Sequence, residues 1–245
     1  MAAAYRYAIY LAPASPWREL GGQWLGRSPE TGQAVARPAG ADPRLDEWTR
    51  EPRLYGLHAT LKAPFRLREG ASPAALDAAM RTLARGFRPF AAPLRLRRLR
   101  GFLAWCLDEG DAAAVQAMQS LADTAVAELD AFRAPATPEE LARRRPHRLD
   151  PVRRALLERW GYPHVFQGFT FHITLTGSLP EPELDEAEAL LRAAAAAAAL
   201  PPAMPVRAVS VYVQPEPGAP FLVARHYGFD GSTADAAGAG WLASR

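Results

Sequence analysis

The sequence predicts an α+β fold of two similar lobes, with two mostly antiparallel sheets facing a central cleft and helices on the outer faces. The first observation is a repeated tetrapeptide, because residues 58–61 read His-Ala-Thr-Leu and residues 172–175 read His-Ile-Thr-Leu. The second is the phasing after each copy, since a helix and two strands are expected to follow both. Pro93 opens a strand 35 positions after His58, and Pro205 opens one 33 positions after His172. A duplicated α+β unit is therefore expected.

The duplication divides the chain into one bilobal domain over residues 1–245. Whether the two lobes exchange strands is left open by the pattern. The expected parts are a first repeat over about 54–132, a helical arginine-rich insertion over about 134–163, a second repeat over about 164–229 and a loose tail over 230–245.

Composition indicates a globular protein. The chain has 245 residues, of which 49% are hydrophobic and 22% charged, enough for one large core or two fused lobes. Its single cysteine, Cys106, excludes an internal disulfide and is typical of a reducing compartment. Arg6 interrupts the apolar N-terminal stretch, so no signal peptide is expected, and the alanine-rich run at 190–200 is too short to span a bilayer. We therefore expect a soluble, cytoplasmic monomer that does not bind membranes, whose net charge of +3 permits a phosphate-bearing partner.

The N-terminal region and first repeat give the clearest strand and helix signals. Residues 5–11 are rich in aromatic and β-favouring residues, which predicts an opening strand. Residues 12–52 carry many glycines and prolines without a sustained period, so loops with short helices around 17–24 and 44–50 are expected. Ser72 before Pro73 is typical of a helix start. The elements expected in the first repeat are a strand at 54–67, a helix at 73–86, strands at 94–100 and 102–107, and a helix at 111–132.

The insertion and the second repeat have their own signals for the start and end of helices. Residues 137–140 read Thr-Pro-Glu-Glu, the form of a capping box, and predict a helix that runs into three arginines at 143–145. Asp150 followed by proline opens another helix that ends at Gly161. The elements expected in the second repeat are a strand at 166–175, a helix at 181–200, and strands at 206–214 and 221–229.

The repeated tetrapeptides supply the candidate catalytic residues. Successive side chains of a strand alternate between faces, so His58 and Thr60 share one face while their apolar neighbours share the other. The same holds for His172 and Thr174. Two such faces turned toward each other would form a cleft with two imidazoles and two hydroxyls. Lys62 lies two positions beyond Thr60 and is expected on the same face, with Thr176 as its counterpart in the second copy.

With these motifs in place, the chain resembles the two-histidine phosphoesterase superfamily. Strings at residues 6–10, 55–65, 160–163 and 171–177 make it similar to an uncharacterised branch encoded in phosphonate-utilisation gene clusters. The resemblance implies phosphodiester chemistry without a metal or other cofactor. It also implies that His58 and His172 are the acid and base and that the threonines bind the phosphate.

The chemistry of these residue types agrees with that implication. Imidazole titrates near neutral pH, so one histidine can activate water while the other protonates the departing ester oxygen. Threonine hydroxyls can donate to the non-bridging oxygens as charge develops there. The sequence does not decide which histidine is the base. The further residues predicted to bind substrate are Lys62, Tyr55, Arg143, Arg144 and Thr176.

The resulting hypothesis is hydrolysis of a small cyclic phosphate ester, such as a ribose cyclic phosphate of phosphonate metabolism. Two alternatives stay open: an RNA 2′,3′-cyclic phosphodiesterase, and a non-catalytic module that binds phosphate or RNA on the same scaffold. A small phosphorylated partner is favoured over RNA because the net charge is nearly balanced. Zinc would need three protein ligands, which neither tetrapeptide supplies. The other histidines, at 147, 164 and 226, are interpreted as non-catalytic.

Overall fold

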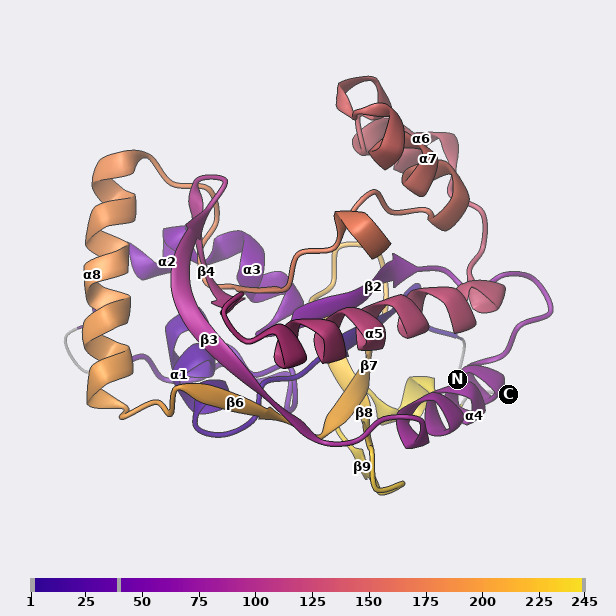
Figure 1. Cartoon of the computed structure of the whole chain (residues 1–245), viewed down its shortest axis with the longest axis horizontal. Helices are drawn as coiled ribbons and strands as arrows, with labels where there is room; N and C mark the ends of the chain where they lie inside the picture. Colours follow the sequence, from indigo (N-terminus) through magenta and orange to yellow (C-terminus); the bar gives the residue numbers. More distant parts are fainter. Residues whose placement is uncertain (1–2, 39–40, 244–245) are drawn as a thin grey trace.

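The structure is a computed structural model that describes residues 3–38 and 41–243, and it has the mixed helix and antiparallel-sheet content expected of an α+β fold (Figure 1). Its strands are β1 (Arg6–Leu11), β2 (Ala59–Phe65), β3 (Phe90–Leu99), β4 (Phe102–Leu107), β5 (His172–Thr174), β6 (Ala203–Val206), β7 (Ala208–Gln214), β8 (Leu222–Gly228) and β9 (Thr233–Asp235). Its α-helices are α1 (Trp17–Leu25), α2 (Leu45–Trp48), α3 (Arg50–Tyr55), α4 (Pro73–Arg85), α5 (Ala112–Glu128), α6 (Pro138–Arg143), α7 (Pro151–Trp160) and α8 (Glu181–Ala197).

The strands of the described residues form one hydrogen-bonded series in the order β6-β3-β4-β5-β2-β1-β7-β8-β9, with every neighbouring pair antiparallel. The expectation of two sheets facing each other is therefore wrong. The physical reason is that β2 and β5, which carry the two tetrapeptides, pair with each other directly at the centre of the series. The two histidine strands lie side by side instead of on opposite walls.

The segments expected as two repeats are interleaved in this sheet. On one side of the centre, β5 from the second repeat pairs with β4 from the first, and β3 then pairs with β6. On the other side, β2 from the first repeat pairs with β1, which pairs with β7 of the second. Strand exchange, which the sequence left open, is thus what the topology shows. Each half of the sheet needs strands from both repeats.

Helices α4 and α5 pack against the sheet, α5 against β2 and β3 and α4 against β8 (Figure 1). The apolar members of the tetrapeptides face a large core, in which Ala59, Leu61, Ile173 and Leu175 are all at most 2% exposed. This burial fixes the register, because a slip by one residue would move the histidines into the core. Within the described part of the chain, no helix is long and apolar enough to cross a membrane.

The insertion between the repeats stands above the sheet as α6 and α7 (Figure 1). The predicted capping box at Thr137 is present, since its hydroxyl accepts from the Glu140 amide and the Glu140 carboxylate accepts from the Thr137 amide. A small apolar cluster joins the insertion to α5 through Val126, Leu156 and Val165. The insertion is therefore anchored at its start and along α7.

Several element bounds differ from the sequence prediction. The strand expected at 206–214 is present as β7, whereas β6, which precedes it and pairs with β3 in the other half of the sheet, was not expected. The strand expected at 166–175 shortens to β5, preceded by a 3-10 turn at Phe166–Gly168. The loose tail is also corrected: β9 pairs with β8, and Leu242 is 3% exposed in the main core, while residues 244–245 lie outside the described residues.

Candidate active site

The pairing of β2 with β5 brings the four candidate catalytic residues onto one face. Ala59 lies opposite Ile173 in this antiparallel pair. Stepping one residue along each strand sets His58 opposite Thr174 and Thr60 opposite His172. Each histidine therefore faces the threonine of the other copy. The two imidazoles occupy a cross-strand diagonal, which in antiparallel sheets spans roughly 7–8 Å between Cα atoms and leaves room for a phosphate between the rings.

The two imidazoles are held in the same way. The Nδ1 atom of His58 lies 2.8 Å from the carbonyl oxygen of Gly56, and Nδ1 of His172 lies 2.8 Å from that of Thr170. A carbonyl oxygen only accepts, so each Nδ1 carries a proton and donates it to the residue two positions earlier. Each Nε2 is then the nitrogen left for chemistry. Within the described residues, the hydroxyls of Thr60 and Thr174 make no hydrogen bond to other protein groups and can meet a ligand.

The surroundings of the two rings differ. Tyr10 stacks on His58 with ring centroids 4.0 Å apart, and Tyr55 stacks on it at 5.9 Å. Burial lowers the pKa of His58 to about 4, with a smaller contribution of the same sign from His172. His172 is flanked by Phe102 at 5.9 Å, and burial lowers its pKa as well, to a smaller extent. Both rings are neutral at pH 7 in the unliganded protein, and His172 is the easier one to protonate.

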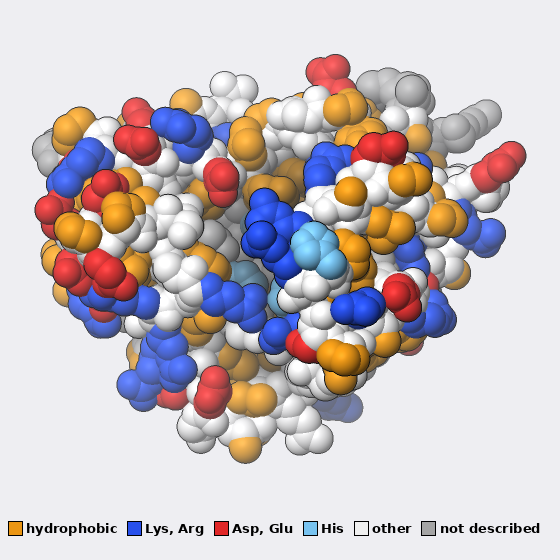
Figure 2. Space-filling view, turned by 90° about the horizontal axis from the view of Figure 1, so that it is seen from above, with side chains coloured by type: hydrophobic (Ala, Val, Ile, Leu, Met, Phe, Trp, Pro, Cys, Tyr) orange, Lys and Arg blue, Asp and Glu red, His pale blue; other side chains and the backbone are white. Residues whose placement is uncertain are grey.

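A cavity of about 390 Å³ opens over this face between the sheet, α3 and the insertion. In the view from above, the molecule is hollowed at this point, with histidine in the hollow and lysine or arginine side chains around it (Figure 2). The cavity is lined by the catalytic candidates His58, Thr60, His172 and Thr174 and by Arg6, Tyr10, Glu51, Pro52, Tyr55, Ala63, Pro64, Phe102, Arg144, Tyr162, Thr176, Gly177 and Ser178.

Lys62 does not share this face, which corrects the sequence prediction. Tyr10 pairs with Thr60 whereas the next residue of β1, Ile9, pairs with Lys62, so β2 contains a bulge with one extra residue. The bulge reverses the alternation and turns Lys62 toward the core. There its ammonium donates to the carbonyl of Val126 at 3.1 Å and to the carboxylate of Asp130 at 3.2 Å. Burial lowers the pKa of Lys62 to about 8, against the attraction of Asp130.

The other predicted binding residues have different positions. Tyr55 and Arg144 line the cavity, and the guanidinium of Arg144 lies 4.8 Å from the ring centre of Tyr162. Thr176 also borders the cavity, but its side chain is fully buried and its oxygen accepts from the amide of Leu103 at 3.0 Å. Arg143 lines a neighbouring cavity instead.

Sequence reasoning missed several residues that line the cavity with polar or aromatic groups, among them Arg6, Tyr10 and Tyr162. Arg6 shares a face with Tyr10 because the pairing of β1 with β7 is regular and the two residues are four positions apart. Tyr162 comes from the loop after α7. The alternation of β1 could have indicated Arg6 and Tyr10, whereas nothing local indicated Tyr162.

The remaining histidines lie outside the cavity lining. His226 is satisfied on both sides, with Nε2 2.8 Å from Glu30 and Nδ1 2.7 Å from the hydroxyl of Ser210. His164 is half-buried, and burial together with the charge of Arg100 lowers its pKa to about 4. Among the described residues, no group of three or more histidine, cysteine, aspartate or glutamate side chains could hold a metal ion.

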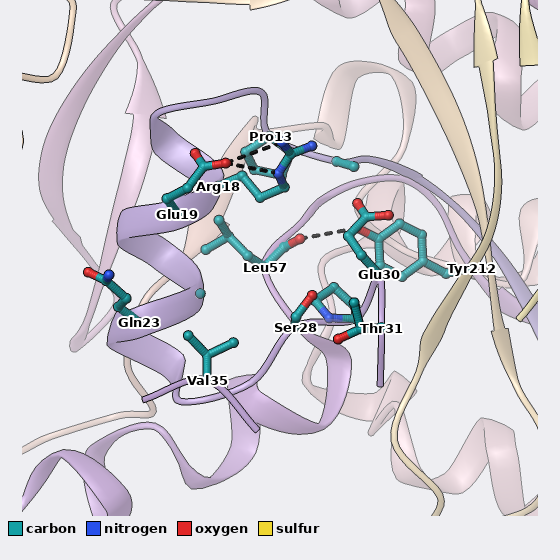
Figure 3. Close-up of a pocket in the computed structure, with 13 residues that line it drawn as sticks. Pro13, Arg18, Glu19, Gln23, Ser28, Glu30, Thr31, Val35, Leu57 and Tyr212 are labelled. Atoms are coloured by element: carbon teal, nitrogen blue, oxygen red, sulfur yellow. Dashed lines mark hydrogen bonds and ion pairs between the residues drawn. The ribbon is translucent and has the colours of Figure 1, made fainter. Parts of the chain in front are cut away.

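A further cavity, of about 450 Å³, is bordered by Leu57, the residue before His58 (Figure 3). The hydroxyl of Tyr212 donates to the carbonyl of Leu57 at 3.2 Å, which fixes the backbone just before His58. The lining of this further cavity includes the ion pair of Arg18 with Glu19 and none of the four catalytic candidates. The four candidate residues therefore line the cavity over β2 and β5 and not this one.

Comparison with known proteins gives a family and two curated relatives. The family described as a protein of unknown function (DUF1045) matches residues 60–222. A protein of Laribacter hongkongensis named ribose 1,5-bisphosphate phosphokinase PhnN is 40% identical over 226 residues, which are 90% of this chain and 51% of that protein. One of the same name from Janthinobacterium sp. is 38% identical over 237 residues, 92% of this chain and 51% of that protein. The chain thus spans about half the length of the curated relatives it matches.

Among solved structures, Usb1 of Kluyveromyces marxianus is similar over 90% of this chain and 98% of that chain. The sequence identity is 9% and the TM-score is 0.35, a likeness too low to support an argument about this protein.

Proposed function

We propose that this chain, which belongs to the DUF1045 family, is a metal-independent phosphodiesterase that hydrolyses a small cyclic phosphate ester. The observation that carries the proposal is the register of β2 and β5, which gives a histidine pair on one diagonal and a threonine pair on the other. The resemblance of both tetrapeptides to the two-histidine phosphoesterase superfamily supports the same reaction.

The geometry supports one assignment of roles. His58 is the base, because burial lowers its pKa to about 4 and keeps its ring neutral. Its Nε2 takes a proton from water as the water oxygen forms a bond to phosphorus. His172 is the acid, since its pKa is lowered less and a bound phosphate anion would raise it further. Its Nε2 gives a proton to the ester oxygen as the bond from phosphorus to that oxygen breaks, and a phosphate monoester with a free hydroxyl results.

The threonines and arginines complete the scheme. The free hydroxyls of Thr60 and Thr174 donate to the non-bridging oxygens, on which charge grows in the transition state. Arg6 and Arg144 border the same cavity and add positive charge to it. These groups supply acid, base and charge stabilisation from side chains alone.

The substrate class is a small sugar phosphate. The cavity over the histidines is about 390 Å³, the size of a site for a small ligand. The name of the two relatives refers to ribose 1,5-bisphosphate, a phosphorylated pentose, and the resemblance stated above implies a place in phosphonate metabolism. Both support a ribose cyclic phosphate.

A screen of cyclic phosphodiesters tests the proposal. Wild-type protein is incubated with ribose 1,2-cyclic phosphate, nucleoside 2′,3′-cyclic phosphates and an oligonucleotide ending in a 2′,3′-cyclic phosphate, and the phosphate monoester is measured. We expect turnover of the small esters that persists in a chelator. Turnover abolished by the chelator and restored by zinc would refute the metal-independent reaction, and tight binding without turnover would identify a binding module. Preference for the oligonucleotide would identify an RNA enzyme.

A further inference from the structure

A second cavity, of about 270 Å³, adjoins the catalytic one beneath the insertion. The two cavities have four lining residues in common, which are Arg6, Tyr55, Pro64 and Arg144. The two cavities are therefore continuous at Arg6 and Arg144. A ligand held between the histidines can extend past these two residues into the second cavity.

The second cavity is lined by five arginines and one glutamate. The arginines are Arg6, Arg66, Arg133, Arg143 and Arg144, and the glutamate is Glu140. The lining therefore carries more positive than negative charge, even after Arg66 and Arg133 are paired with Glu140 and Asp130, and this excess favours an anion.

Two of these arginines are paired within the protein. Arg66 binds the carboxylate of Glu140 at 3.2 Å and the carbonyl of Pro135 at 2.8 Å, and so ties α6 to the chain that follows β2. Arg133 binds the carboxylate of Asp130 at 2.7 Å. Their role is to hold the cavity in shape.

Among the described residues, the other three arginines form no direct ion pair, although the charges of Arg143 and Arg6 act at longer range on Glu139 and Glu140. The Nε–H group of Arg6 donates to the side-chain oxygen of Gln214 at 2.8 Å. Its two terminal nitrogens donate to no other described residue. Arg143 donates Nε to the backbone carbonyl of Glu139 at 3.3 Å, and Arg144 rests on the ring of Tyr162. Three guanidinium groups with unpaired nitrogens thus border one concave site. The planar fork of guanidinium binds a phosphate through two parallel hydrogen bonds.

We propose that the substrate carries a second phosphate group, a monoester remote from the cyclic phosphate, and that Arg6, Arg143 and Arg144 bind it in the second cavity. This inference rests on the proposed function, in which the cyclic phosphate lies between His58 and His172. Arg6 and Arg144 lie at the junction of the cavities, and Arg143 borders the second cavity alone. Arg143 is therefore the residue that separates the two sites experimentally.

The test uses pairs of substrates that differ in one phosphate. Ribose 1,2-cyclic phosphate is compared with its 5-phosphate, and adenosine 2′,3′-cyclic phosphate with its 5′-phosphate. We expect kcat/KM to be about ten- to a hundredfold higher for the member with the second phosphate, the worth of one or two charge-assisted hydrogen bonds. Arg143→Gln should reduce this preference about tenfold.

Arg148→Gln is the matched control, because it removes the same charge from the same insertion at an exposed residue that lines neither cavity. It should leave the preference unchanged. Equal kcat/KM for the two members of each pair would overturn the inference. An equal loss in Arg143→Gln and Arg148→Gln would also overturn it, since a diffuse positive field would then explain the preference.

Binding distinguishes failure of this inference from failure of the proposed function. If no member of either pair is hydrolysed, the proposed function fails, and calorimetry with the same compounds on the His58→Ala/His172→Ala variant decides the second site. Binding at least tenfold tighter for the member with two phosphates supports the site. Equal binding of both members overturns it, and so does tighter binding of an oligonucleotide with a 2′,3′-cyclic phosphate end than of either small ester.

Discussion

The two copies of the tetrapeptide are alike where they meet the cavity and different everywhere around it. In both, a histidine donates its Nδ1 proton to the carbonyl two residues earlier, and a threonine two residues later keeps a free hydroxyl. Around them, Tyr10 and Tyr55 stack on His58, whereas the ring of Phe102 near His172 is tilted by 56°. The two copies therefore present the same pair of groups, an imidazole Nε2 and a hydroxyl. The pKa of His58 is lowered further than that of His172.

The strands also diverge beyond the tetrapeptides. On β2 a bulge turns Lys62 into the core, where it binds Asp130. After β5 the chain leaves the ladder, and Thr176 accepts a hydrogen bond from the amide of Leu103. Lys62 and its counterpart Thr176 thus both make hydrogen bonds within the protein. Under the proposed mechanism, the asymmetry between the two rings comes from burial, which lowers the pKa of His58 further than that of His172.

The largest effect is expected from removing either histidine. His58→Ala and His172→Ala should each reduce kcat/KM for the best small cyclic ester about 10²- to 10⁴-fold, because each loses an acid or base that the other cannot replace. The double variant should lose little more than the worse single variant, since the two act as a unit. Steady-state kinetics measures this, with circular dichroism as the check on folding. Full activity in a folded single variant would contradict the mechanism.

A smaller effect should distinguish Thr174, whose hydroxyl is free, from Thr176, whose oxygen accepts from the amide of Leu103. Thr174→Val removes a donor to the phosphate and should lower kcat about 10²-fold with little change in stability. Thr176→Val leaves the Leu103 amide buried without its acceptor and should lower the free energy of unfolding by about 1–3 kcal/mol with little change in kcat. Urea unfolding and kinetics on both variants test the contrast. The reverse pattern would show that the register of β5 is misassigned.

Lys62 offers a test of the bulge. Lys62→Ala breaks a buried ion pair, although Asp130 keeps Arg133 and Arg159, so we expect a loss of about 2–3 kcal/mol in the free energy of unfolding. Because the side chain points away from the cavity, kcat/KM of the folded variant should match that of the wild type. A large loss of activity at unchanged stability would show that Lys62 acts in the cavity.

The smallest effect is a pH dependence that distinguishes the two rings. His58 has a pKa of about 4 when folded, below its ordinary value near 6.5, so the unfolded chain binds a proton that the folded chain does not. Stability should therefore fall as the pH drops from about 6.5 toward 4, and this penalty should be absent above that window. Between pH 7 and pH 5, the melting temperature of His58→Gln should fall by less than that of the wild type. His172→Gln should reduce the loss by a smaller amount, since burial lowers its pKa less. Identical curves for both variants would contradict the difference in burial.

Local patterns were sufficient for much of the fold. The helix starts at Ser72, Thr137 and Asp150 have the capping bonds that their residue types predict, because capping depends on neighbours within three positions. The hairpin of β3 and β4 forms across the turn expected near Gly101, which has a φ of +87°. The short helices expected around 17–24 and 44–50 in the irregular region are present as α1 and α2. Their placement was not predictable, since α1 is held by contacts distant in sequence, including a hydrogen bond from Trp24 to the carbonyl of Leu175.

The sequence by itself determined the α+β class, the two His-Thr devices and the capped insertion, because periodicity and capping act over a few residues. Only the tertiary structure decided that β2 and β5 are neighbours, that the repeats are interleaved and that Lys62 points into the core. Strand order depends on which long-range pairing buries the most apolar surface, and a bulge reverses alternation without any local signal. For the same reason, the cavity that joins Arg6 of β1 to Arg144 of the insertion could be found only once the chain was folded.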